Sequence, residues 1–184
     1  MLELYNKFRD SLSLLEDVAP LLFRFLLAYV FYVTGMMKFN NFEGIVYWFE
    51  HGLNLPFPTL NAFMATATEV AGFVLLFLGL GTRLISIPLF FVMIVAMVTV
   101  HMDNGWLVIG SSDLNPEIAS RLSAAKDILK EYGNYDWLTE KGSFVILQNG
   151  IENVVTYMAM LLSLIVKGPG KISLDALLEA KLNK

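Results

Sequence analysis

The sequence contains no cysteine. This absence excludes disulfide bonds, thiolate metal sites and any dithiol electron relay that the chain itself could supply. Redox chemistry in this protein would therefore need a bound cofactor, a quinone, a metal held by other ligands, or a partner protein.

Charged residues are also scarce. They make up 16% of the 184 residues, whereas 56% are hydrophobic and the mean hydropathy is +0.59. A soluble domain usually has about 25% charged residues. The net charge of −4 is small and the basic residues are scattered, so nothing indicates nucleic-acid binding. The composition favours a lipid bilayer as solvent and, at this length, a single domain.

The first 19 residues mix charged and apolar positions. They lack the basic segment, the apolar core and the small-residue cleavage site of a signal peptide. We therefore expect the first apolar helix to remain in the mature protein.

Four apolar stretches approach the roughly 20 residues that a helix needs to cross a bilayer. Helix-ending glycines close two of them, at Gly79-Leu80-Gly81 and Gly168-Pro169-Gly170. A soluble all-helical protein is the alternative, but four such stretches leave too little polar surface to cover them. The sequence predicts an all-α, four-helix transmembrane bundle, a single domain over 1–184, with spans at about 20–37, 59–80, 84–102 and 150–166.

Two further segments lie between these spans. Asn41–Pro58 is rich in aromatic residues and predicts a short interfacial or re-entrant helix after the first span. Residues 103–149 form a long polar insert, in which Pro116–Tyr132 has apolar residues at helical spacing. These residues are Ile118, Leu122, Ala125 and Leu129, and they predict an amphipathic helix that lies on the membrane or caps the bundle.

The distribution of lysine and arginine predicts the orientation. Four spans place both termini and the 81–84 turn on one side of the membrane. That side carries Lys7, Arg9, Arg83, Lys167, Lys171, Lys181 and Lys184. Because basic residues near span ends favour the cytoplasm, we expect an inner-membrane, multi-pass protein with both termini cytoplasmic and the insert outside.

Ionisable residues within spans are costly, and each is a candidate for function. Glu69 lies near the middle of the second predicted span, and its side chain is too short to reach water. It must be protonated or paired with a cation, and Arg24 in the first span is the candidate partner. Such an Arg24–Glu69 pair can also be purely structural, and Arg24 alone can extend to the headgroups.

Three more polar residues mark the outer ends of the predicted spans. Lys38 closes the first, His101 closes the third and Glu152 opens the fourth. An antiparallel bundle would bring them to one level, with Glu69 below, so the four residues are predicted to line a ligand site. The alternative is that Lys38 and Glu152 are ordinary helix ends and His101 is an interfacial histidine.

Met93, Met97 and His101 follow one another at four-residue spacing. Soft sulfur and imidazole ligands suit Cu(I), so these residues are a candidate copper site. Methionine is also a common packing residue in apolar helices, and both interpretations remain open at this stage.

The ordered set of these features resembles the DoxX family. The resemblance covers about 20–175, apart from a 107–148 insert that is longer than in a minimal member. It rests on Arg24, Gly35 and Lys38 in the first span; Glu69, Gly72, Gly79 and Arg83 in the second; Thr99, His101, Asn104, Gly105 and Trp106 at the end of the third; and Gly150, Glu152, Gly168-Pro169-Gly170, Ser173, Leu174 and Asp175 in the fourth and after it.

The resemblance implies links to thiosulfate:quinone oxidoreductase, to membrane complexes that defend against thiol and oxidative stress, and to operons for copper-binding peptides. The C-terminal GPG-K-x-S-L-D sequence resembles the last of these branches. The family has no agreed catalytic residue.

Three functions follow. The leading one is a small redox-linked inner-membrane protein, a candidate oxidoreductase subunit, that binds a quinone or similar amphiphile within the bundle. His101 and a buried carboxyl would then exchange protons with the ligand. The second is a non-catalytic membrane anchor or assembly partner that docks soluble enzymes through residues 103–149. The third is copper or metallophore-peptide handling. Protein partners or a homo-oligomer are expected in each case.

Overall fold

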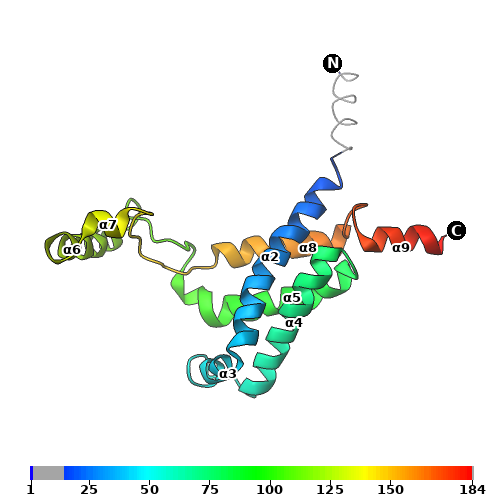
Figure 1. Ribbon diagram of the computed structural model, residues 1–184, viewed down its shortest axis with the longest axis horizontal. Coiled ribbons are helices and arrows are strands. Elements are labelled where there is room, and N and C mark those ends of the chain that lie inside the picture. The colour runs from blue at the N-terminus through cyan, green and yellow to red at the C-terminus, as the bar shows by residue number, and fades with distance from the viewer. Residues whose placement is uncertain (2–14, 184) are drawn as a thin grey trace. The chain divides into compact units, whose positions relative to one another are not determined.

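The computed structural model describes Met1 and residues 15–183, and its regular elements there are helical, apart from one isolated bridge (Figure 1). Three of the charges behind the orientation prediction, Lys7, Arg9 and Lys184, lie outside the described residues. The chain divides into two compact units. The first comprises Met1–Ala96 and Thr156–Lys184, and the second comprises Met97–Val155.

The first unit is built around two adjacent antiparallel helices, α2 (Val18–Asn40) and α4 (Pro58–Leu78). Between them in the chain, α3 (Phe42–His51) packs on α4 through a small core of Ile45, Phe49 and Ala62. This is the predicted short helix after the first span. The unit also contains α5 (Thr82–Ala96), most of α8 (Glu152–Lys167) and α9 (Leu174–Leu182).

The described residues contain three helices that are long and apolar enough to cross a membrane, at Val18–Asn40, Pro58–Leu78 and Thr82–Asn104. The predicted fourth span corresponds to α8, which has 16 residues. At 1.5 Å per residue this is about 24 Å, shorter than a hydrocarbon core of about 30 Å. The helical class is confirmed, and three of the predicted spans are helices long and apolar enough to cross a membrane, whereas the four-helix bundle stays a prediction.

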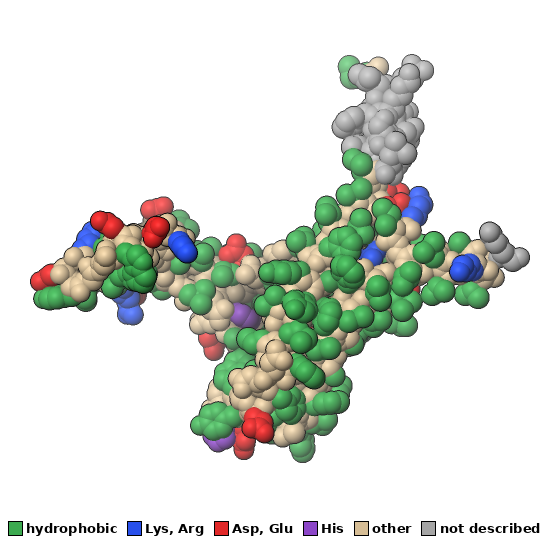
Figure 2. Space-filling model, in the orientation of Figure 1, with side chains coloured by type: hydrophobic (Ala, Val, Ile, Leu, Met, Phe, Trp, Pro, Cys, Tyr) green, Lys and Arg blue, Asp and Glu red, His purple; other side chains and the backbone are tan. Residues whose placement is uncertain are grey.

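The outer faces of these helices are apolar, as a bilayer requires. Figure 2 shows hydrophobic side chains over much of the visible surface of α2 and α4. Phe63 and Phe77 of α4 and Phe91 of α5 are each about 60% exposed. Contact of such side chains with lipid is favourable, whereas their exposure to water is unfavourable. The apolar surface therefore agrees with the composition.

The second unit begins with a π-helical turn, η1 (Met97–His101), which replaces the last α-helical turn expected for the third span. Residues 105–110 then pair with 146–152 through backbone hydrogen bonds such as Gly110 N–H to the Ile146 carbonyl. Between them lie α6 (Pro116–Tyr132) and α7 (Tyr135–Thr139). The α6 helix has the predicted bounds, because the Asn115 side chain caps it by accepting from the Glu117 N–H.

Two introduced cysteines test how many spans the chain has. Because the sequence has no native cysteine, Ser112→Cys in the second unit and Asn183→Cys after α9 give single labelling sites. Four spans with cytoplasmic termini predict that an impermeant thiol reagent added to intact cells labels position 112 and spares position 183. If α8 does not cross, both sites lie on one side and share the same result, and labelling at 183 alone would reverse the predicted orientation.

Candidate functional site

The middle of α4 carries a buried ion pair. The Lys38 Nζ donates to both oxygens of the Glu69 carboxylate, at 2.8 Å to Oε2 and 3.0 Å to Oε1. The Glu69 side chain is 2% exposed and that of Lys38 is 14% exposed. The structure therefore brings together two of the four residues predicted to line a ligand site.

Local geometry explains this pairing. A helical side chain leans toward the helix N-terminus, so Lys38 in the last turn of α2 reaches back toward the level of Glu69. Gly35, one turn before Lys38, lets the two helices approach closely, because a Cβ at position 35 would lie 3.1 Å from the Glu69 Cβ. The Gly35–Lys38 spacing could therefore have predicted this pair from the sequence. A glycine indicates that another helix comes close, and the lysine one turn later supplies a cation beside that helix.

The predicted Arg24–Glu69 pair is wrong. The Arg24 guanidinium donates instead to backbone carbonyls: Nε to Leu76 at 2.9 Å, Nη2 to Phe77 at 3.1 Å, and Nη1 to Pro169 at 3.2 Å and Ile172 at 2.6 Å. The antiparallel register places Arg24 beside the C-terminal end of α4. Leu76 lies two helical turns beyond Glu69, about 10 Å along the axis. The positive guanidinium there meets the negative end of the α4 dipole.

Residues 168–175, here called the closing segment, form hydrogen bonds with the end of α4, the start of α5 and the start of α2. The Asp175 carboxylate accepts from the N–H groups of Gly81 at 2.7 Å and Thr82 at 3.0 Å, which caps the start of α5. The Asp175 N–H in turn donates to the Gly79 carbonyl. Before α2, the Asp17 carboxylate accepts from the Lys171 N–H at 2.8 Å, and this bond lowers the pKa of Asp17.

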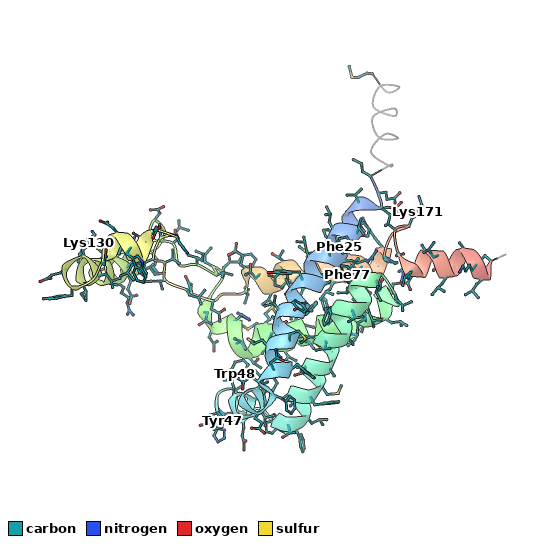
Figure 3. All side chains as sticks on the ribbon, in the orientation of Figure 1. Phe25, Tyr47, Trp48, Phe77, Lys130 and Lys171 are labelled. Carbon is teal, nitrogen blue, oxygen red and sulfur yellow. The ribbon has the colours of Figure 1, made fainter. Side chains whose placement is uncertain are left out.

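An aromatic groove runs along α2 and α4. It is a cavity of about 440 Å³ lined by three aliphatic side chains and by the rings of Phe25, Tyr29, Tyr32, Phe73 and Phe77. Phe25 and Phe77 lie side by side, with ring centroids 5.4 Å apart (Figure 3). Tyr32 meets Phe73 edge to face at 5.3 Å. Because Phe73 follows Glu69 by one helical turn, the groove begins next to the ion pair.

His101 and Glu152, the other two predicted site residues, belong to the second unit. The His101 Nδ1 is 2.9 Å from the Asn149 carbonyl oxygen, which can only accept, so we infer that Nδ1 carries a proton. In the neutral ring Nε2 is then an acceptor. The Glu152 carboxylate accepts from the Val108 N–H at 3.2 Å. Both side chains hold the pairing of 105–110 with 146–152, and a site formed by all four residues stays a prediction.

The candidate copper ligands also divide between the units. Met93 is buried in α5, whereas Met97 and His101 lie in η1. Among the described residues there is no group of three or more His, Asp or Glu side chains that could hold a metal ion. Copper binding by the two methionines and His101 stays a prediction.

Comparisons with known proteins address the first helices most directly. Residues 19–102 match the family model of DoxX. A Bacillus subtilis protein named "Putative oxidoreductase CatD" is 31% identical over 86 residues, which cover 47% of this chain and 62% of that protein. An uncharacterized protein of Haemophilus influenzae is 27% identical over 167 residues, covering 89% of this chain and 85% of that protein. No solved structure matches the chain significantly.

Proposed function

Because residues 19–102 match the DoxX family model, we propose that this membrane protein is redox-linked and binds a quinone-like amphiphile against α2 and α4. A relative carries the name of an oxidoreductase. The chain has no cysteine of its own to carry electrons. The observation that supports the proposal is the buried Lys38–Glu69 ion pair, one helical turn from an aromatic groove.

The groove suits a flat apolar ring with a hydrocarbon tail. Aromatic side chains pair with other rings in offset or edge-to-face geometry, and five rings line this cavity. Its walls belong to two candidate membrane spans, so a ligand can enter from the bilayer without crossing water. The volume of about 440 Å³ lies within the range of small-molecule pockets.

The ion pair can supply what the groove lacks, polar groups for the ring oxygens of a quinone. Reduction of a quinone consumes two electrons, which we assign to a reduced partner protein, and two protons, which we assign to solvent. The ammonium of Lys38, whose side chain is 14% exposed, would donate a hydrogen bond to a ring oxygen and pass each proton on from solvent, while the Glu69 carboxylate holds the ammonium in place. Ionisable residues inside membrane spans commonly mark substrate or proton pathways. His101 and Glu152 are left out, because each already stabilises the second unit.

The proposal is tested by extracting ligands from the detergent-purified protein and identifying them by mass spectrometry. We expect a quinone in the wild type and at least a tenfold lower content in Phe73→Ala and Phe77→Ala, which remove groove walls. Phe63→Ala is the matched control, because Phe63 is an exposed α4 ring outside the groove. Equal quinone content in all four proteins, or phospholipid alone in the wild type, would contradict the proposal.

A second candidate function rests on the second unit. Ile128 and Tyr132 of α6 and Trp137 of α7 are 60%, 79% and 68% exposed. Exposed aromatic side chains of this size are common at the centres of protein interfaces. This observation favours an anchor that docks a soluble protein. Co-purification of a soluble protein that is lost in Trp137→Ser would support docking, and stoichiometric Cu(I) in the purified chain would support copper handling instead.

A further inference from the structure

A second cavity lies between the start of α5 and the C-terminal helix α9. Its volume is about 260 Å³. Its walls include Arg83 and Leu84 from α5, Asp175, Leu178, Glu179 and Leu182 from α9, and the backbone around Gly81 and Pro169. The cavity therefore combines one cation, two carboxylates and three leucines.

Two opposite charges in this cavity are available to a ligand. The Arg83 guanidinium is fixed by bonds to the carbonyls of Ile165, Val166 and Lys167 at the end of α8, which use three of its five N–H donors. The Asp175 carboxylate is occupied by its cap on α5. Glu179 is the remaining carboxylate, and the salt bridges found among residues 15–183 do not join it to Arg83.

The position of the cavity indicates where its ligand comes from. Gly81 belongs to the turn between Pro58–Leu78 and Thr82–Asn104, two helices that can span a membrane, so the cavity lies where two spans end. Lipid headgroups occupy this level of a bilayer. Leu178 and Leu182 are 48% and 85% exposed. Contact of these side chains with water is unfavourable, whereas contact with lipid acyl chains is not.

We propose that this cavity binds the headgroup of a zwitterionic phospholipid with a primary ammonium, as in phosphatidylethanolamine. The phosphate would accept from Arg83, and the ammonium would donate to Glu179. A trimethylammonium group has no N–H to donate, and an anionic glycerol headgroup would be repelled by Glu179. The volume is below the roughly 300–1,000 Å³ of pockets that enclose drug-sized ligands, which suits a headgroup with its tails outside.

Native mass spectrometry of the full chain in detergent tests this inference. Phosphatidylethanolamine, phosphatidylcholine and phosphatidylglycerol with matched acyl chains are added separately. We expect the wild type to retain the first about tenfold better than the others, the effect of one charge-assisted hydrogen bond. Glu179→Gln should abolish this preference while phospholipid binding continues. Lys181→Gln on the same helix is the control and should keep the preference.

The Glu179→Gln variant is the decisive test, because Glu179 lies on an exposed face of α9. Arg83→Gln is less specific, because it also removes hydrogen bonds to α8. Equal retention of the three lipids, or an unchanged preference in Glu179→Gln, would overturn the proposal. Soluble glycerophosphoethanolamine serves as a further probe. If it binds as well as the lipid, the ligand is a soluble zwitterion and the assignment to a membrane lipid is wrong.

Discussion

Replacing Lys38 with methionine should lower the free energy of unfolding in detergent by about 3–5 kcal/mol, the cost of leaving one member of a buried ion pair without its partner. Glu69 is 2% exposed and cannot reach water when Lys38 is removed. Glu69→Gln should cost less, because the longer Lys38 side chain is already 14% exposed and can extend to solvent. Thermal unfolding of both variants measures this difference.

The double variant Lys38→Met/Glu69→Gln should recover part of the loss, since it leaves no unpaired charge. Glu117→Gln is the control, because its ion pair with Arg121 is exposed on both sides and such pairs contribute little. Losses at positions 38 and 69 that add strictly would show that these side chains do not interact. A Lys38→Met loss no larger than that of Glu117→Gln would show that the pair is not buried.

Gly79→Ala should destabilise the first unit far more than Gly81→Ala. Both glycines have positive φ, +66° and +58°, so alanine meets a similar backbone penalty of about 1–2 kcal/mol at each. At Gly79 the new Cβ would also lie 2.5 Å from the Arg24 guanidinium, whereas at Gly81 nothing lies within 4 Å. Arg24 must then give up bonds to carbonyls of α4 and the closing segment, at about 1.5–3 kcal/mol for each bond lost.

The two alanine variants therefore isolate the contribution of the Arg24 hydrogen bonds from that of backbone strain. Arg24→Met removes all four hydrogen bonds that Arg24 donates. It should lower the melting temperature at least as much as Gly79→Ala does. The measurement is the melting temperature of each purified variant in one detergent. Equal melting temperatures for Gly79→Ala and Gly81→Ala would mean that the Arg24 bonds contribute little to stability.

Hydropathy and helix-end residues predicted the elements of this chain well. The bounds of α6 follow from Asn115 and Pro116 at its start and Gly133 after its end, which are local signals. The burial of Glu69 and its need for a cation followed from its depth in an apolar span. These features depend on short stretches of sequence.

Which cation pairs with Glu69 depends on the register of α2 against α4. The positions of the spans in the sequence do not determine this register. Lys38 and Arg24 lie about four turns apart in α2, and only the register decides which of them lies beside Glu69. The partners of Arg24 were also hidden, because they are backbone carbonyls and carry no residue-type signal. Apolar periodicity likewise could not separate Met97–Val155 as a compact unit or place a π-helical turn at its start.

The bonds from Arg24 to Pro169 and Ile172 join residues 145 and 148 positions apart in the sequence. During synthesis the ribosome makes α2 long before it makes those two carbonyls. The guanidinium therefore lacks these two acceptors until residue 172 has been translated. A nascent chain that stops before the closing segment would expose an arginine without its full set of acceptors, a feature that membrane quality-control proteases could recognise.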